Sequence, residues 1–161
     1  MAKVSKLQIT ENYANALFKA AEAENLLDAM RADCQNIEAS LLQTPQLKIF
    51  NSPEVKLSEK KNLLAQIAKV LKLSNPTVNF LELLAGKRRF NLLSDILQYV
   101  RHLDLKKQGI LEINAESVQE LSDKQKQKLE KGLEKALNTS IIVNYKINPA
   151  ILGGLSIQYN S

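Results

Sequence analysis

Gly86 and Lys87 are the first residues to consider for chemistry, because a phosphate-binding loop ends with a glycine followed by a lysine. Such a loop also requires a glycine five residues before Gly86 and a serine or threonine directly after Lys87. The chain has Leu81 and Arg88 at these two positions. The sequence therefore does not predict a phosphate loop here.

The other reactive residue types do not combine into a catalytic or metal site. His102 is the single histidine, so no zinc cluster and no Ser-His-Asp triad can form. Cys34 is the single cysteine, and no base lies near it in the sequence. Gly153-Gly154 lacks the other glycines of a dinucleotide-binding loop, and no pair of carboxylates stands in an apolar setting. We therefore expect no cofactor, no metal and no enzymatic activity.

The stretch 75–103 predicts two helices that meet at a corner. Asn75 is the expected cap of the first helix, with Pro76 at its first position, and Gly86 is expected to take the left-handed conformation that ends the helix. The first helix is apolar on almost every side, which indicates that protein surrounds it. The second helix has one apolar stripe, made of Phe90, Leu93, Ile96, Leu97, Val100 and Leu103.

Three further amphipathic helices are predicted before this pair. The first runs from about Thr10, its expected cap, to about Glu24, and its many alanines would let another helix approach closely. The second begins near Leu27, with Asp33 on its polar side. The third starts at Ser58 as its cap, and Lys60 faces outward.

The period of the apolar pattern changes after Lys107. Apolar residues alternate with polar ones in 110–116, in 141–147 and after Gly153-Gly154, which predicts three strands. Ser122 and Gln125 form a capping box for a helix between the first two strands. We therefore predict an α+β fold, with a six-helix antiparallel bundle over 1–106 followed by a small β-α-β-β domain over 107–161.

The composition is that of a folded protein without a membrane span. The chain has 161 residues, 45% of them hydrophobic, and no apolar run of the roughly 18 residues that a bilayer requires. No secretion signal or transit peptide is evident. The net charge of +5 leaves open a basic nucleic-acid-binding module that would use Arg88, Arg89 and the lysines of 57–73.

Three segments resemble one family, the delta subunit of the F-type ATP synthase, called the oligomycin-sensitivity-conferring protein in mitochondria. Tyr13-Ala14-Asn15-Ala16-Leu17-Phe18 resembles the family's Tyr-Ala-x-Ala-Leu-Phe. The run from Asn79-Phe80-Leu81 to Arg89 and Leu92-Leu93 is similar to its Asn-Phe-Leu and Arg-x-x-Leu-Leu. The turn Asn148, Pro149, Ala150, Ile151, Leu152, Gly153, Gly154 is close to its Asp-Pro-Ser-Leu-Ile-Gly-Gly.

The resemblance implies a stator subunit of the peripheral stalk, in one copy per complex. In the family, the N-terminal domain holds N-terminal helices of the alpha subunits of the catalytic head, and the C-terminal domain holds the end of the b-subunit stalk. Direct membrane insertion and nucleic acid are not expected. The expected location is the cytoplasmic face of the bacterial inner membrane, or the matrix or stroma side in an organelle. The positions carried over as contacts with the alpha-subunit helix are Tyr13, Ala14, Ala16, Leu17, Asn79, Phe80, Leu83 and Leu84.

Two alternatives remain open at this point. Each carried-over position fits ordinary core packing as well as partner contact, and a structural adaptor of another assembly would need the same apolar faces.

Family members also continue through an Asp-Gly-Ser turn into another strand and helix, whereas this sequence stops at Ser161. A short natural form, a truncated copy or a strand edge paired by a partner would each explain that difference.

Overall fold

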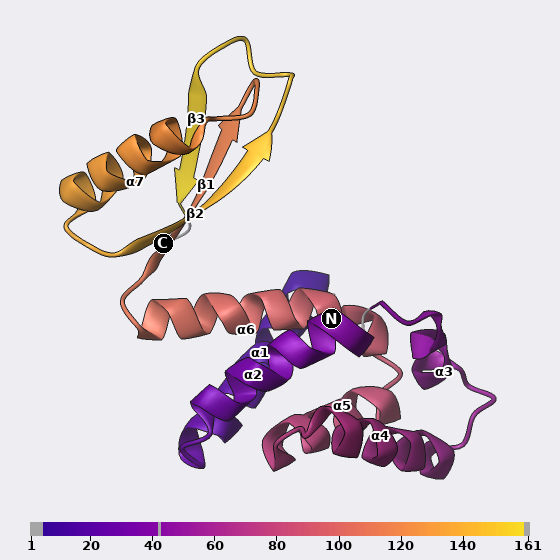
Figure 1. Ribbon diagram of the computed structural model, residues 1–161. Coiled ribbons are helices and arrows are strands. Elements are labelled where there is room, and N and C mark those ends of the chain that lie inside the picture. The colour runs from indigo at the N-terminus through magenta and orange to yellow at the C-terminus, as the bar shows by residue number, and fades with distance from the viewer. Residues whose placement is uncertain (1–4, 42, 160–161) are drawn as a thin grey trace. The chain divides into compact units, whose positions relative to one another are not determined.

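The computed structural model describes residues 5–41 and 43–159 and contains helices and a three-stranded sheet. The predicted α+β class is confirmed. The chain divides into two compact units, Met1–Leu103 and Asp104–Ser161 (Figure 1). The described residues of the first unit form helical segments without a strand. These are α1 (Lys6–Ala23), α2 (Leu27–Asn36), the π-helical turn η1 (Ile37–Leu41), the 3-10 turn η2 (Pro45–Leu47), α3 (Lys48–Asn51), α4 (Leu57–Leu71), α5 (Asn75–Gly86), the 3-10 turn η3 (Phe90–Leu92) and α6 (Leu93–Lys107). The end of α6, from Asp104 on, falls in the second unit.

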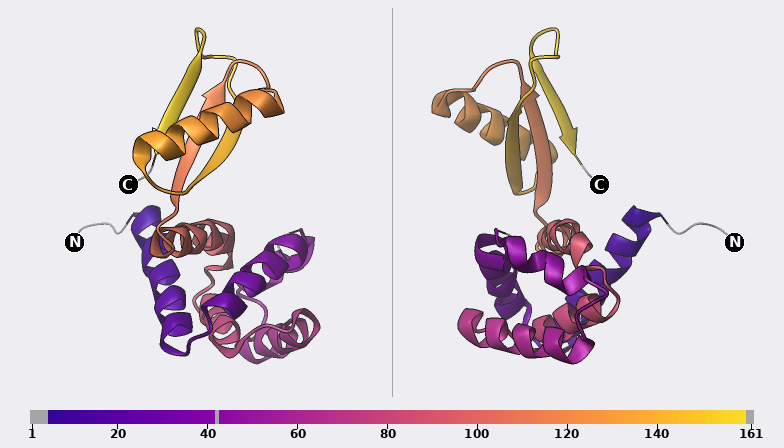
Figure 2. Two further views of the ribbon diagram at one scale, coloured as in Figure 1. Left: turned by 60° about the vertical axis from the view of Figure 1, so that its left-hand side comes forward. Right: turned by 90° about the vertical axis from the view of Figure 1, so that its right-hand side faces the viewer.

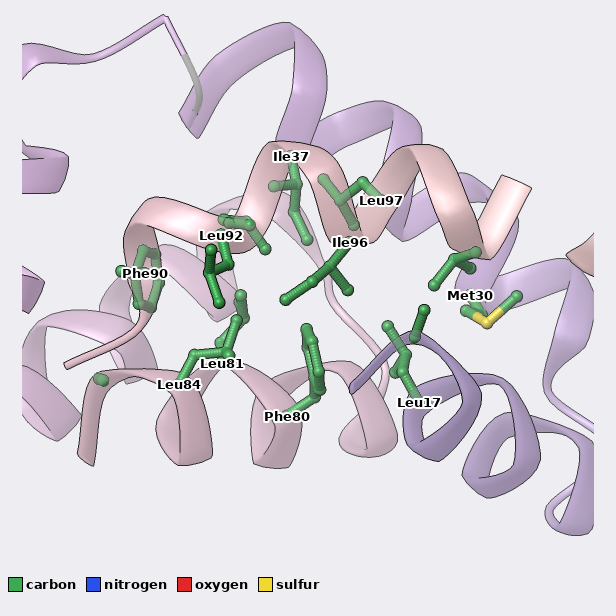
Figure 3. Close-up of a cluster of buried hydrophobic side chains, with 14 of the residues drawn as sticks. Leu17, Met30, Ile37, Phe80, Leu81, Leu84, Phe90, Leu92, Ile96 and Leu97 are labelled. Carbon is green, nitrogen blue, oxygen red and sulfur yellow. The ribbon is translucent and has the colours of Figure 1, made fainter. Parts of the chain in front are cut away.

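The core of the first unit is formed by the apolar faces that the helical spacing predicts. Leu17 of α1, Leu84 of α5 and Ile96 of α6 are each at most 2% exposed, and they point toward one another between the helices (Figure 3). Phe50 of α3 stacks on Phe90 of η3 with ring centroids 4.4 Å apart. Burial of these side chains is the main stabilising contribution, at about 25 cal/mol for each Å² of apolar surface removed from water.

The start of α1 differs from the prediction. The helix begins at Lys6, and Ser5 is its cap, because the Ser5 hydroxyl accepts a hydrogen bond from the Gln8 amide at 3.1 Å. Thr10 lies inside the helix, where its hydroxyl donates to the Lys6 carbonyl at 3.0 Å. The expected cap at Thr10 is therefore wrong, because the Thr10 hydroxyl bonds to a carbonyl within the helix and does not cap its first turn.

The start of α4 is also different. Lys56 occupies the cap position without a side-chain hydrogen bond, and Ser58 lies in the first turn. Lys60 does not face outward, because it is 3% exposed and its ammonium donates to the Ser52 carbonyl at 2.8 Å. That bond to the preceding loop satisfies the buried charge.

The corner after α5 uses a different residue from the one predicted. Gly86 is the last residue of the helix, and the left-handed conformation falls on Arg88, whose φ is 54°. The Arg89 amide then donates to the Leu84 carbonyl at 2.9 Å. The left-handed residue that ends α5 is thus Arg88, two residues after the predicted Gly86.

The second unit contains β1 (Leu111–Ser117), α7 (Asp123–Leu137), β2 (Ile141–Ile147) and β3 (Leu155–Tyr159). The strand order is β2-β1-β3, with β1 parallel to β2 and antiparallel to β3. The helix α7 lies across one face of this sheet (Figure 2). The predicted capping box of Ser122 and Gln125 is confirmed at its start.

Candidate functional site

The eight predicted contact positions all lie on α1 or α5, and they divide into two groups. Four of them belong to the core, where their side chains are 0–6% exposed: Ala14, Leu17, Phe80 and Leu84. The other four reach the surface: Tyr13, Ala16, Asn79 and Leu83. Leu83 is 46% exposed, although Leu81 and Leu84 of the same helix are buried. The structure therefore places half of the predicted set where a partner can reach it.

Helical spacing explains this division. Tyr13, Ala16 and Ala20 follow each other at intervals of three and four residues, so they form one line along α1. Asn79 and Leu83 form the corresponding line on α5. We call these five residues the α1–α5 surface, and the core residues lie directly beneath it.

Tyr13 joins the two helices. Its ring meets Phe80 edge to face with centroids 6.3 Å apart. The Arg89 guanidinium lies 5.6 Å from the centre of the Tyr13 ring, and Arg89 Nη1 donates to the Tyr13 hydroxyl at 3.1 Å. These contacts fix the tyrosine in one orientation and hold a positive charge beside the α1–α5 surface.

The position of α5 depends on a residue that the sequence pattern placed on the outside. Asp33 of α2 is 3% exposed, and its Oδ2 accepts hydrogen bonds from the Ser74 amide at 3.0 Å and from the Thr77 hydroxyl at 2.7 Å. The predicted cap at Asn75 is wrong, because Ser74 is the cap residue and Asp33 supplies the capping oxygen from another helix. A negative charge at this end also stabilises the helix dipole.

A second polar contact holds α5 on the side of α4. The Lys61 ammonium lies 2.9 Å from a carboxylate oxygen of Glu82. Because both side chains are partly exposed, this ion pair contributes at most about 1 kcal/mol. The ion pair joins α5 to α4 at Glu82, the residue that precedes Leu83 in the sequence.

The turn motif of the second unit is a built structure between β2 and β3. Asn148 donates from its amide to the Ser117 carbonyl at 2.8 Å and from Nδ2 to Glu116 Oε2 at 2.7 Å, and its Oδ1 accepts from the Ala150 amide at 3.1 Å. Pro149 follows in the turn. Gly153 and Gly154 have backbone φ values of 150° and 84°, which residues other than glycine rarely adopt. The motif therefore fixes the path of the chain into β3.

Two kinds of feature are absent from the described part of the chain. Within it, no group of three or more His, Cys, Asp or Glu side chains could hold a metal ion. Among the same residues, no helix is both long and apolar enough to cross a membrane. The α1–α5 surface is the candidate site because it exposes Leu83 and small side chains, which are suited to packing against another helix.

Comparisons with known proteins identify the family. The family model described as ATP synthase delta (OSCP) subunit matches residues 9–161. The ATP synthase subunit delta of Desulfitobacterium hafniense is 33% identical over 151 residues, which cover 93% of this chain and 84% of that protein. The ATP synthase subunit delta of Nitrobacter winogradskyi is 29% identical over 154 residues, which cover 95% and 83% of the two chains.

A solved structure shares the fold. The chain is similar to a chain of the Toxoplasma gondii mitochondrial ATP synthase hexamer, with a TM-score of 0.66 and 23% identity, over 91% of this chain and 83% of that one. The match of sequence and fold extends over both units. The chain belongs to the ATP synthase delta (OSCP) subunit family and is a non-catalytic component of the peripheral stalk.

Proposed function

We propose that this chain links the catalytic head of the ATP synthase to the b-subunit stalk and resists the torque of the rotor. Residues 1–106, as a six-helix antiparallel bundle, bind N-terminal helices of the alpha subunits. Residues 107–161, as a small β-α-β-β domain, bind the end of the b subunits. One copy serves each complex, at the cytoplasmic face of the bacterial inner membrane or at the equivalent face in an organelle.

The observation that carries this proposal is the exposed leucine Leu83 on α5, together with the small exposed residues of α1, which Tyr13 joins to α5. Leu83 presents a leucine side chain to solvent, and the exposed Ala16 and Ala20 of α1 are small enough to let a partner helix approach α1 closely. An amphipathic helix that places its apolar side on this surface removes Leu83 from water without disturbing the core. We therefore assign Tyr13, Ala16, Asn79 and Leu83 to direct contact, and the four buried positions to support from beneath.

The mechanical role requires tight binding and no reaction. The catalytic head is pushed round when the central shaft turns, so the stalk must supply an opposing torque through interfaces that stay closed. Nanomolar affinity corresponds to about −12 kcal/mol. A few desolvated apolar anchors such as Leu83 and Tyr13 can supply most of that binding free energy.

Family membership does not support the alternative of a nucleic-acid-binding module. The physical difference between the two functions is salt dependence, because phosphate contacts weaken steeply as salt increases and apolar contacts do not. One of the arginines of that alternative, Arg89, is engaged with Tyr13. Its charge therefore contributes to the proposed helix-binding surface.

A calorimetric titration tests the proposal. The full chain is titrated with a peptide of the N-terminal segment of the cognate alpha subunit, at low and at high salt. Saturable binding that survives high salt is the expected result. Absence of peptide binding, together with salt-sensitive binding to DNA or RNA, would contradict it.

A further inference from the structure

Three consecutive basic residues follow the last residue of α5. Lys87, Arg88 and Arg89 are all exposed, and we call them the basic corner. None of them forms an ion pair with a carboxylate of the described residues. Glu82, the single acidic residue of α5, is paired with Lys61 at 2.9 Å. The positive charge of the basic corner is therefore not paired within the described part of the chain.

Arg89 differs from its two neighbours because its guanidinium is held in place. Arg89 Nη1 donates to the Tyr13 hydroxyl at 3.1 Å, and the guanidinium lies 5.6 Å from the centre of the Tyr13 ring. Tyr13 is itself positioned by its edge-to-face contact with Phe80. A guanidinium that is already oriented loses less conformational entropy when it binds a partner.

The guanidinium of Arg89 has donors to spare. It carries five N–H groups, and within the described residues the bond to Tyr13 is its one hydrogen bond. A carboxylate accepts two parallel N–H bonds from a guanidinium, and such charged, two-point pairs are among the stronger hydrogen bonds in proteins. Arg89 can therefore bind one carboxylate without giving up its contact with Tyr13.

Apolar side chains reach the surface directly before the basic corner. Leu83 is 46% exposed, and Gly86 follows it by one helical turn. Leu57 of α4 lies against Gly86, with its Cδ1 atom 3.7 Å from the position that a Cβ atom of Gly86 would occupy, and it remains 47% exposed. A partner that covers these leucines also brings its own side chains close to the basic corner.

We propose that Arg89 binds a side-chain carboxylate of the alpha-subunit helix and so sets the direction of this helix along the α1–α5 surface. Tyr13, Ala16 and Ala20 follow one another along α1, and Arg89 stands at the Tyr13 end of this line. The acidic end of the partner helix therefore lies at Tyr13. The inference rests on the proposed function for the choice of partner, and its own content is the specificity-determining residue and the acidic residue that it selects.

The surroundings of Arg89 favour this direction over the reverse one. A helix bound in the reverse direction would cover the guanidinium without supplying a carboxylate, and a charge removed from water without a partner is unfavourable. A nucleic-acid phosphate would pair with the basic corner but would leave Leu83 and Leu57 in water. An amphipathic helix with an acidic residue at one end of its apolar side satisfies both features.

The test is a double-mutant cycle between the full chain and a peptide of the N-terminal segment of the cognate alpha subunit. The peptide has an amidated C-terminus, so that side chains supply its only carboxylates, and each Asp or Glu is replaced in turn by Asn or Gln. The chain carries Arg89→Gln or Arg89→Lys. Arg101→Gln is the matched control, because it removes the same charge from an exposed arginine of α6, a helix without a residue of the α1–α5 surface. Calorimetry at low and at high salt measures each pair.

We expect Arg89→Gln to weaken peptide binding at least about tenfold at low salt and less at high salt. Arg89→Lys should have a smaller effect, because lysine keeps the charge but lacks the planar fork of donors. One neutralised peptide should bind the unchanged chain about as weakly as the original peptide binds Arg89→Gln, and combining the two changes should cause no further loss. Arg101→Gln should bind within about twofold of the unchanged chain. Circular dichroism should show the same helix content in all variants.

The direction of the bound helix has its own measurement. A nitroxide label on the end of the peptide nearer the selected carboxylate should broaden the amide resonance of Tyr13 more than that of Ala20. A label on the opposite end should reverse this order. Stronger broadening of Ala20 by the first label would overturn the assigned direction.

The outcomes separate this inference from the proposed function. Equal peptide binding by Arg89→Gln and the unchanged chain would overturn the role of Arg89 while leaving alpha-subunit binding intact. Losses that simply add for every neutralised peptide, or a cognate segment without Asp or Glu, would overturn it as well. Absence of peptide binding by the unchanged chain would contradict the proposed function itself. DNA binding that is lost in Arg89→Gln, with peptide binding unaffected, would assign the basic corner to phosphate instead.

Discussion

The carboxylate of Asp33 accepts a hydrogen bond from the Thr77 hydroxyl at 2.7 Å, although 44 residues separate them in the sequence. Both side chains are buried, at 3% and 1% exposure. The same carboxylate oxygen receives the Ser74 amide, so one side chain of α2 caps the first turn of α5. The orientation of the exposed Leu83 therefore depends on a contact made at the opposite end of its helix.

Replacing Asp33 with alanine should lower the free energy of unfolding by about 2–3 kcal/mol, because the Ser74 amide and the Thr77 hydroxyl lose a charged acceptor. Asp28→Ala on the same helix is the matched control, since the Asp28 side chain is 95% exposed and is paired with Arg31 near the surface. Its effect should stay within about 0.5 kcal/mol. Urea denaturation followed by circular dichroism measures both, and equal effects would contradict the capping role of Asp33.

The sequence was sufficient for the apolar faces, because these depend only on helical and strand spacing. The stripe from Phe90 to Val100 and the alternation of buried and exposed residues around Ile113 follow directly from periods of about 3.6 and 2 residues. The capping box of Ser122 and Gln125 was also predictable, since both partners lie within one turn. Other local predictions were wrong where a neighbouring residue could take the same role, since Ser5 and not Thr10 caps α1, and Arg88 and not Gly86 takes the left-handed conformation.

The sequence was not sufficient where a partner comes from another element. Asp33 and Lys60 carry charges that are normally exposed, and only the fold brings Thr77 and the Ser52 carbonyl to them. The same limit applies to the site, because spacing does not separate the exposed Leu83 from the buried Leu84. Leu83 and Leu84 are adjacent leucines in a helix that is apolar on almost every side. The sequence pattern therefore does not indicate which of the two is buried.

Leu83→Asp should weaken binding of the alpha-subunit peptide at least about tenfold while changing the free energy of unfolding by less than about 1 kcal/mol. Leu84→Ala, one residue away, should instead destabilise the chain by about 2–5 kcal/mol, since Leu84 is fully buried. Calorimetry and denaturation on both variants make the comparison. If Leu83→Asp unfolds the chain, Leu83 belongs to the core and its assignment to the α1–α5 surface is wrong.

The hydroxyl of Tyr145 should make the second unit less stable in strongly alkaline solution. Burial, followed by the hydrogen bond to Glu130 and the charge of that carboxylate, raises the pKa of Tyr145 from 10.0 to about 12. The folded state therefore holds this proton more tightly than the unfolded state. Its contribution is complete below pH 10 and is lost as the pH rises through about 12.

Comparison with Tyr145→Phe isolates this effect from the other groups that titrate in the same range. The stability difference between the unchanged chain and the variant should be constant below pH 10 and shrink above it. Because the chain has four tyrosines, the difference in tyrosinate absorbance between the unchanged chain and Tyr145→Phe gives the pKa of Tyr145. A Tyr145 hydroxyl that titrates near its ordinary value would show that the contact with Glu130 is not maintained in solution.

Asn148→Asp should destabilise the turn before β3, even though aspartate suits such turns in general. In this chain Asn148 Nδ2 donates to Glu116 Oε2 at 2.7 Å, and an aspartate would place two carboxylates against each other. We expect a loss of about 1–2 kcal/mol at neutral pH, with recovery in acid as one carboxyl binds a proton. The double variant Asn148→Asp, Glu116→Gln should restore stability at neutral pH, and failure to do so would exclude this pairing as the cause.

The central claim is that this chain bridges the catalytic head and the b-subunit stalk, and cosedimentation tests it most directly. The purified cognate head, stripped of this subunit, is mixed with a fragment of the b subunit in the presence and in the absence of the chain. The stator account predicts that the b fragment sediments with the head only when the chain is present, and that Leu83→Asp reduces this cosedimentation. Equal sedimentation of the b fragment with and without the chain would contradict it.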